Sequence, residues 1–502
     1  MTDDKHSRRT FLATSLATAA SLGFAPATGR ARSDTSSLAE LSLKEASERL
    51  RARAVSSVDL TRACLARIDA FNPLLNAFIT VTRDEALKTA RRMDAELRRG
   101  VLRGPMHGIP IALKDNIDTA GVRTTGASEV FADRVPDVDA DVARRLKEAG
   151  AVLLGKLNLH EFAYGGNSTV SYFGTMHNPW NPAYETGGSS GGPGAAVAAG
   201  LCFAALGTDT AGSVRIPASH CGIVGLKPTY GRVSTRGVIP LSWTLDHVGP
   251  MCRTVEDTAI VLSVIAGHDD REPTTVDEPV PDYTATLGRV TAGLKLGTPR
   301  NPFYRDVRPE VERAVGAAVG IMRRFSARVA DVELPAWGQP ATIWGAEAYA
   351  YHEPWMTKMP EKYQASTRRS LQHGSEILAW KYAAARREVD LLRQSIERVF
   401  DDVDLLVLPT VKRPPARLGT EQPSLGNNNV AFDVFGLPAI SLPCGFTASG
   451  LPIGVQIVGR HFAEPTLLAV AEAYQRATDW HERRPPLASF TKTPAIRTSP
   501  RA

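Results

Sequence analysis

Apolar residues recur along the chain with two different spacings, and these spacings predict helices and strands in alternation. Residues 42–45 (Ser-Leu-Lys-Glu) fit a capping box at the start of a helix. The apolar spacing over residues 60–71 predicts a second helix. Residues 77–81 predict a strand, and residues 84–99 predict a charged amphipathic helix.

Three short apolar runs further along the chain predict buried strands. They cover residues 150–155, 404–408 and 453–458, and the last of them alternates as a strand does. Strands that alternate with helices predict an α/β fold, in which an open sheet is covered by helices. The acidic, proline-rich stretch 269–282 is the best candidate for a surface loop or a boundary. Nothing in the pattern requires a second folding unit.

Composition and charge exclude several classes of protein. Of the 502 residues, 43% are hydrophobic and 22% are charged, which excludes a disordered or collagen-like chain. The length allows about three domains or one large α/β domain. The formal net charge of +6 is spread over short arginine pairs, so binding to nucleic acid or to a membrane surface has little support. The five cysteines lie far apart without a C-x-x-C pair, which predicts neither a zinc finger nor a disulfide scaffold.

The first residues have the layout of an export signal. A positively charged stretch with an arginine pair at 8–9 comes first, and an uncharged run of apolar and small residues over 11–27 ends in a small-residue cleavage site. Residues 7–12 resemble the twin-arginine signal, which carries folded proteins across a bacterial inner membrane. We therefore expect a signal peptide over residues 1–27, a mature domain over residues 28–502 and a periplasmic or secreted protein. The run is too short for a stable membrane anchor. The alternative is a cytoplasmic N-terminus with a chance pair of arginines.

Residues 185–230 contain an unusual density of glycine, serine and alanine, which lets the backbone approach a ligand or another backbone closely. Neither of the phosphate-binding motifs G-x-x-x-x-G-K-[ST] and G-x-G-x-x-G occurs in this stretch. Residues 187–191 fit the nucleophile elbow G-x-S-x-G, which needs a strand directly before it. The prolines of residues 177–182 predict a loop there, so we do not assign an elbow. A glycine-rich turn that only packs against a sheet is the alternative to a functional loop.

Five strings of the chain resemble the amidase signature family and occur in the family's order. They are GIPIALKDNID (108–118), GGSSGGPGAAVAAG (187–200), GTDTAGSVRIPASHCGIVGLKPT (207–229), GLPAISLPCGF (436–446) and GLPIGVQIVG (450–459). The resemblance extends from Leu41 to the region of Arg483, nearly the whole mature chain. It implies one large α/β domain whose open, twisted, mixed sheet is covered by helices on both faces.

The resemblance maps the family's catalytic trio onto Lys114, Ser189 and Ser213, and the separation of 24 residues between the two serines matches the family's arrangement. A serine hydroxyl is a poor nucleophile at neutral pH and needs a base within reach. A lysine amine is a base only when it is uncharged, which requires burial to lower its pKa from about 10.4. Ser189 then relays the proton of Ser213 to Lys114. Taken singly, Lys114 is equally compatible with a lysine at the surface. Ser189 and Ser213 are equally compatible with hydroxyls that bond to nearby backbone groups in a turn.

The resemblance also implies a cis peptide bond between Gly188 and Ser189, and an oxyanion hole formed by backbone N–H groups. The expected donors are the N–H groups of Thr210, Ala211, Gly212 and Ser213.

Three neighbouring residues have expected structural roles: Asp209 and Arg215 form a charge pair or cap that fixes the loop, and Ser190 orients the glycine-rich turn by hydrogen bonding. We expect neither a metal nor a cofactor, since His160-Glu161 lacks the second histidine of H-E-x-x-H. Residues 489–492 fit S-x-x-K by chance, in a polar tail.

These residues predict an amide hydrolase that forms an acyl-serine intermediate. The strongest rival within the family is the glutaminase subunit of a tRNA-dependent amidotransferase, and Arg368-Arg369 resembles its glutamine-holding arginine region. The glutaminase subunit carries, in addition, an acidic residue shortly before its Asn-x-x-Gly-Leu-Pro string. Here the string begins at Asp433, and residues 423–432 contain no acid, so the ammonium group of glutamine lacks its expected partner. This favours an amidase that hydrolyses amides over an amidotransferase subunit. A carbamate or ester hydrolase of the same family, and a scaffold protein without turnover, stay open.

The aromatic middle segment predicts either an acyl pocket for aryl or hydrophobic amides or helix faces buried in the core. It contains Trp337, Trp344, Trp355 and Trp380, together with Tyr349 and Tyr351. The expected partner is a small-molecule amide substrate and not a nucleic acid. A homodimer is compatible with the resemblance, because dimers are common on this fold.

Overall fold

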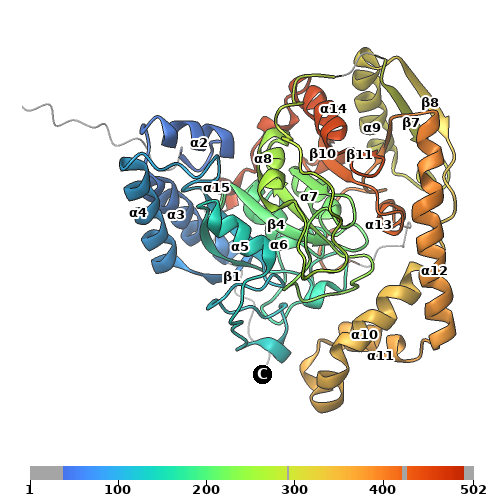
Figure 1. Ribbon diagram of the computed structural model, residues 1–502, viewed down its shortest axis with the longest axis horizontal. Coiled ribbons are helices and arrows are strands. Elements are labelled where there is room, and N and C mark those ends of the chain that lie inside the picture. The colour runs from blue at the N-terminus through green and yellow to red at the C-terminus, as the bar shows by residue number, and fades with distance from the viewer. Residues whose placement is uncertain (1–37, 291–292, 421–426, 491–502) are drawn as a thin grey trace, which may run out of the picture.

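One mixed β-sheet of 11 strands runs through the molecule, and the helices flank it (Figure 1). The computed structural model describes residues 38–290, 293–420 and 427–490. The strand order is β1-β3-β2-β4-β6-β5-β10-β11-β9-β7-β8. The strands are β1 (Phe78–Val81), β2 (Pro110–Lys114), β3 (Val152–Leu157), β4 (Ala204–Asp209), β5 (Val224–Lys227), β6 (His247–Cys252), β7 (Lys295–Pro299), β8 (Arg328–Val332), β9 (Leu405–Pro409), β10 (Ala439–Phe446) and β11 (Pro452–Gly459).

The sheet is parallel where β2 pairs with β3 and β4, and where β7 pairs with β8 and β9. The other pairings are antiparallel, including β4 with β6 and β10 with β11. Every residue of β2, β4, β5, β6, β9 and β11 is buried. Strands with both faces covered are nearly continuous in apolar residues, as these are. The expected single α/β domain with a mixed sheet flanked by helices is confirmed.

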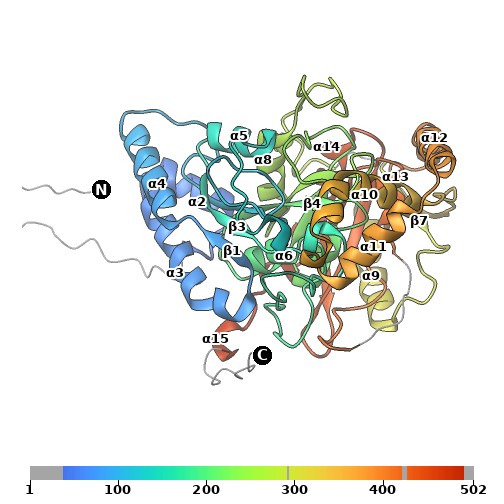
Figure 2. The ribbon, with the colours of Figure 1, turned by 90° about the horizontal axis from the view of Figure 1, so that it is seen from below.

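The helices form separate layers around this sheet. They are α2 (Leu43–Arg51), α3 (Ser57–Leu75), α4 (Arg83–Arg98), α5 (Asp141–Glu148), α6 (Gly191–Ala198), α7 (Arg215–Cys221), α8 (Val255–Ile265), α9 (Pro309–Met322), α10 (Pro340–Lys358), α11 (Ala365–Ser375), α12 (Ala379–Ser395), α13 (Val430–Val434), α14 (Glu464–Arg476) and α15 (Leu487–Phe490). Helices α6 and α7 pack on each other and on the central strands, whereas α14 packs on α8, α9 and the β10–β11 pair. Helices α10, α11 and α12 lie on the side of the molecule opposite to α2, α3 and α4 (Figures 1 and 2).

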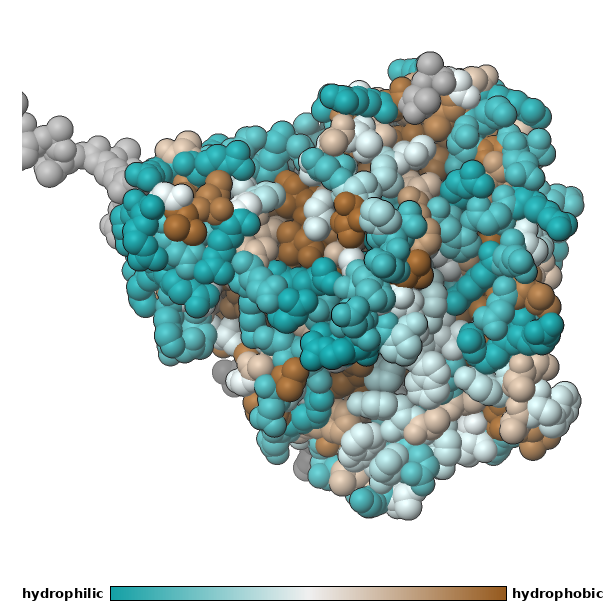
Figure 3. All heavy atoms as spheres, in the orientation of Figure 1, coloured by the Kyte–Doolittle hydropathy of each residue, from teal (hydrophilic) through white to brown (hydrophobic). Residues whose placement is uncertain are grey.

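The predicted elements are present near their predicted bounds. Ser42 caps α2 through its side chain and forms the capping box with Glu45. The second predicted helix is α3, the charged helix is α4, and the four predicted strands are β1, β3, β9 and β11. The stretch 269–282 contains neither helix nor strand, as expected of a surface loop. The face seen in Figure 3 is mostly hydrophilic, and its hydrophobic residues form separate patches.

The five cysteines are free and buried. No helix within the described ranges is long and apolar enough to cross a membrane. The predicted signal peptide over residues 1–27 lies outside the described residues.

Candidate active site

Lys114 ends strand β2, which lies between β3 and β4 in the sheet, and its side chain is fully buried. Its Nζ donates to Ser189 Oγ at 2.8 Å, to Thr208 Oγ1 at 2.7 Å and to the Thr208 carbonyl at 3.4 Å. The predicted pair of Lys114 and Ser189 is therefore in direct contact, although 75 residues separate the two in the chain. Sequence analysis did not single out Thr208, which lies inside the string GTDTAGS.

Burial lowers the pKa of Lys114 to about 7, while the carboxylates of Asp209 and Asp246 act to raise it. Removal from water disfavours the charged amine, and nearby negative charge favours it. A large share of the amine is therefore uncharged near neutral pH, which is the state that a general base requires.

Ser189 lies in the loop that leads into α6, and its peptide bond with Gly188 is cis, as the resemblance implies. The Ser189 carbonyl accepts hydrogen bonds from the backbone N–H of His160 at 3.1 Å and from Ser168 Oγ at 3.3 Å. A Cβ at Gly188 would lie 2.7 Å from the Ser168 nitrogen, so only glycine fits against this neighbouring loop. Ser189 is fully buried, and these contacts hold its backbone in place.

Ser190 ties the two serine loops to strand β4, in agreement with the orienting role predicted for it. Its Oγ donates to the Thr208 carbonyl at 3.2 Å and accepts from the Thr208 N–H at 3.3 Å. Its backbone N–H donates to the carbonyl of Ser213 at 3.2 Å. Ser190 therefore holds the loop of Ser213 next to the loop of Ser189.

Ser213 lies in the loop between β4 and α7. It is 8% exposed and lines a cavity of about 320 Å³ together with Thr210 and Ala211, which we call the proximal cavity. Among the described residues, no hydrogen bond joins the hydroxyls of Ser189 and Ser213. Catalytic hydrogen bonds are often long in free enzymes and tighten when substrate binds.

The predicted oxyanion donors divide into two groups. The N–H of Gly212 donates to Asp209 Oδ1 at 2.5 Å. In this structure the Asp209 carboxylate therefore holds the N–H group of Gly212, one of the four expected oxyanion donors. Thr210 and Ala211 line the proximal cavity, and Thr210 Oγ1 donates to Asp246 Oδ1 at 2.5 Å. Asp246 also accepts from the N–H groups of Leu241 and Ser242, a role that nothing in its local sequence indicated.

A buried ionic cluster fixes the Ser213 loop, as the pairing of Asp209 with Arg215 predicted. Arg215 Nε and Nη2 each donate to the Asp209 carboxylate at 3.0 Å, and Nη2 also donates to Asp433 Oδ2 at 2.6 Å. Burial alone acts to raise the pKa of Asp209, but the Arg215 guanidinium holds that pKa well below its usual range. Asp209 stays ionised and accepts the N–H of Val214 at 3.1 Å as well.

The walls of the proximal cavity are largely apolar. Ala163, Tyr164, Ile216, Leu241 and Trp344 contribute to them. The aromatic middle segment thus supplies one tryptophan to this cavity.

The other three tryptophans of that segment lie elsewhere. Trp337 packs on Phe303, and Trp355 packs on Phe131. Trp380 is 65% exposed. Trp344 therefore lines the cavity that contains Ser213, as the pocket interpretation requires, and Trp337 and Trp355 pack as the core interpretation predicts.

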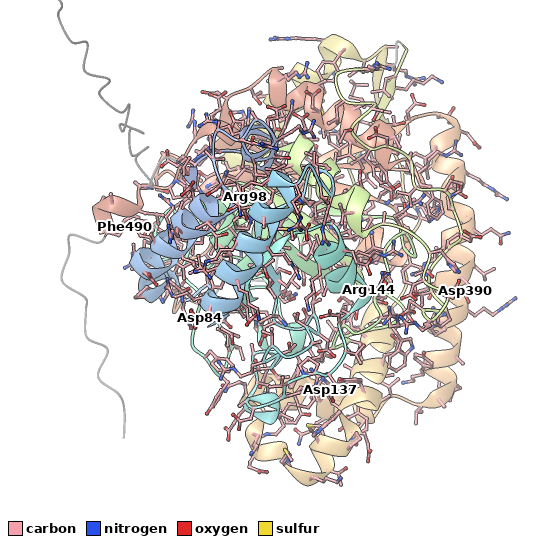
Figure 4. The ribbon with its side chains drawn as sticks, turned by 60° about the vertical axis from the view of Figure 1, so that its left-hand side comes forward. Asp84, Arg98, Asp137, Arg144, Asp390 and Phe490 are labelled. Carbon is pink, nitrogen blue, oxygen red and sulfur yellow. The ribbon has the colours of Figure 1, made fainter. Side chains whose placement is uncertain are left out.

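Arg368, the first of the paired arginines, lies on α11 and directs Nη1 to the carbonyl of Pro360 at 3.4 Å. Ser489, the first residue of the S-x-x-K string, is on α15, which lies near α2 and α3 (Figures 1 and 2). Lys492 is outside the described residues. Phe490 of α15 and Asp390 of α12 lie on opposite sides of the molecule in Figure 4. Within the described parts of the chain, no group of three or more His, Cys, Asp or Glu side chains could hold a metal ion.

Comparisons with known proteins give a consistent result. The family model described as Amidase matches residues 59–468. A glutamyl-tRNA(Gln) amidotransferase subunit of Moorella thermoacetica is 41% identical over 480 residues, which cover 89% of this chain and 98% of that protein. An amidase of Pseudomonas putida is 42% identical over 469 residues, which cover 90% of this chain and 99% of that protein. The solved structure of native peptide amidase from Stenotrophomonas maltophilia matches with a TM-score of 0.82 and 34% identity, covering 90% of this chain and 99% of that chain.

Replacement of a member of the buried cluster tests its structural role. Asp209→Asn leaves Arg215 buried with one carboxylate fewer, and we expect the free energy of unfolding to fall by about 3 kcal/mol or more. Asp331→Asn is the control, because its ion pair with Arg300 is exposed and contributes less than about 1 kcal/mol. Urea unfolding of the two variants measures both values. Equal stability of the two variants would contradict the assigned role.

Proposed function

The chain belongs to the amidase family and is a hydrolase of amide C–N bonds, and we propose that it works through an acyl-serine intermediate on Ser213. The observation that carries this proposal is the buried amine of Lys114, 2.8 Å from the hydroxyl of Ser189. A buried lysine with a pKa near 7 is able to take a proton, whereas a surface lysine is charged and is not.

The proposed proton path has three members. The uncharged Lys114 amine accepts the proton of the Ser189 hydroxyl, and Ser189 accepts the proton of the Ser213 hydroxyl. Ser213 Oγ then forms a bond to the amide carbonyl carbon, and the carbonyl electrons move to its oxygen. When the C–N bond breaks, the same path returns the proton to the leaving nitrogen. Water, deprotonated along this path, hydrolyses the acyl-serine and releases the carboxylic acid.

The path closes when the Ser213 hydroxyl turns toward Ser189. The Ser190 N–H already holds the Ser213 backbone beside the Ser189 loop, so rotation of one side chain is the remaining step. Negative charge on the carbonyl oxygen is stabilised by the N–H groups of Thr210, Ala211 and Ser213, and Gly212 is excluded from this set by its bond to Asp209.

Aryl or hydrophobic amides are the proposed substrates, because Tyr164, Ile216, Leu241 and Trp344 give the proximal cavity an apolar wall. The same site also suits esters and carbamates of the same shape. A glutaminase subunit is the second candidate, on the basis of the 41% identity to the Moorella thermoacetica protein. The lack of an acid in residues 423–432 and the contact of Arg368 with Pro360 disfavour it. Glutamine turnover together with co-purification of a partner protein would favour it.

We further propose that residues 1–27 are a twin-arginine signal peptide and that the mature chain, 28–502, acts in the periplasm or outside the cell. The arginine pair and the uncharged run that follows it support this proposal. N-terminal sequencing of protein from the periplasmic fraction tests it. A homodimer is compatible with the resemblance to the family, and sedimentation of the mature protein measures the assembly directly.

Removal of the proposed base is the most direct test of the proton path. Lys114→Met should lower kcat/KM for an anilide by about 10³-fold or more, because the acting groups work as a unit. It should also abolish fluorophosphonate labelling of Ser213 at pH 7. Lys88→Met is the matched control, since Lys88 is exposed on α4. Circular dichroism checks that both variants are folded. An adduct on a residue other than Ser213 would overturn the role assignment.

The pH dependence of the reaction follows from the lowered pKa of Lys114. Only the uncharged amine is active, and its fraction rises with pH through the pKa of about 7. We therefore expect kcat/KM to rise about tenfold per pH unit below pH 7 and to level off above it. Measurement of kcat/KM between pH 5 and 9 gives this profile. A rate that is highest at acid pH would exclude Lys114 as the base.

Trp344 provides a test of the apolar cavity. Trp344→Ala should lower kcat/KM for an anilide by about tenfold, because it removes apolar surface from the wall. The control Trp380→Ala removes an exposed ring and should leave the value unchanged. Assays with anilides and with acetamide separate the effects. A wild-type preference for acetamide would contradict the proposed substrate class.

A further inference from the structure

A second and larger cavity of about 800 Å³ adjoins the proximal cavity, and we call it the distal cavity. The two cavities share Tyr164, Gly165, Gly166, Ile216 and Asn427 as common wall. A substrate held at Ser213 therefore has space to extend beyond the common wall. None of the steps proposed for the reaction uses the residues that only the distal cavity contains.

Two histidines of the distal cavity are buried and have unpaired ring nitrogens. His160 and His220 are 6% and 4% exposed. Within the part of the chain that the structure describes, His160 Nδ1 and both ring nitrogens of His220 have no hydrogen-bond partner. His220 Nδ1 is 3.9 Å from Glu185 Oε1, too far for a hydrogen bond. Buried polar atoms are nearly always paired in folded proteins. The Arg413 backbone acts on the His220 ring and the Asn167 side chain acts on the His160 ring, and the cavity beside both rings leaves space for a ligand that completes their pairing.

Burial lowers the pKa of both His160 and His220 to about 4. Each ring is therefore neutral at pH 7 and carries one N–H donor and one acceptor. His220 also lies against the serine loop, since a Cβ at Gly187 would be 3.0 Å from its Nδ1. A ligand that pairs with His220 thus lies close to the loop that carries Ser189.

The charges around the distal cavity favour an anion. Lys412 and Arg413 both line it, and Glu185 is the one carboxylate among its described lining residues. Lys412 is 8% exposed, and its Nζ donates a hydrogen bond to the Pro302 carbonyl at 3.1 Å. An ammonium has three donors, so the described contacts leave two for a ligand. The Glu185 carboxylate accepts the N–H of Ala416 at 3.2 Å, and burial raises its pKa.

We propose that the distal cavity is a second substrate subsite that binds a carboxylate of the amide substrate, with Lys412 as its counter-ion and His220 as a hydrogen-bond donor. This inference rests on the proposed amide hydrolysis at Ser213. It narrows the substrate class to amides that carry an apolar part next to the scissile bond and a free carboxylate several bonds away. Charge-assisted hydrogen bonds of this kind are stronger than neutral ones and therefore discriminate between an acid and its ester.

The test compares acids with their neutral esters as substrates. The substrates are the 4-nitroanilides of succinic, glutaric and adipic acid and the methyl ester of each. We expect the wild-type enzyme to prefer the acid for at least one chain length by about tenfold in kcat/KM. Lys412→Met should remove that preference by raising KM for the acid, and should leave kcat/KM for the ester unchanged. Lys412→Arg should retain the preference, and Lys88→Met, on exposed α4, should behave as wild type.

Two outcomes would overturn the subsite. In the first, kcat/KM for the ester equals that for the acid at every chain length. In the second, Lys412→Met lowers kcat/KM for the acid and for the ester by the same factor. Both leave the proposed amide hydrolysis intact. If no amide is hydrolysed, the proposed function fails, and calorimetric titration with glutarate decides on the subsite alone. Binding to the wild type and its loss in Lys412→Met support the subsite, and absence of binding to the wild type refutes it.

Discussion

The exclusion of water from one amine is the constraint on which the rest of this site depends. Lys114 lies on β2 beside β4, and every residue of these two strands is buried. Its hydrogen-bond partners are Ser189 and Thr208. A sheet with helices flanking it provides such a place, whereas a loop at the surface does not. The carboxylates of Asp209 and Asp246 act against the effect of burial, so the pKa settles near 7 and not far below it. The fold therefore sets the protonation state as well as the position of the base.

The nucleophile loop depends on a second buried arrangement. Asp209 ends β4 and binds backbone N–H groups of the following turn, while Arg215 begins α7 and binds Asp209 and Asp433. One strand, one turn and one helix are thereby joined around a single guanidinium. Because the sheet orders β4 next to β2, the loop that this cluster fixes lies beside the base.

Local patterns in the sequence predict much of this arrangement, whereas the directions of backbone N–H groups and the contacts between distant residues are not local properties. The capping box at Ser42 and the apolar runs that become β3, β9 and β11 are local patterns, and they appear where expected. The motif strings identify Lys114, Ser189 and Ser213 as residues. The direction of a backbone N–H is not written in such strings, and Gly212 therefore appears free in the sequence although it binds Asp209. Asp246 contacts Thr210 across 36 residues, and only the folded chain shows that contact.

The burial of all five thiols limits their reactivity toward oxidants and metal ions. Removal from water raises the pKa of Cys64 to about 12 and raises the pKa of the other four as well. The thiolate, which is the reactive form, is therefore scarce at any physiological pH. Oxidants and metal ions meet no accessible sulfur of these residues while the molecule stays folded. Burial therefore protects these five thiols in a reducing and in an oxidising compartment alike.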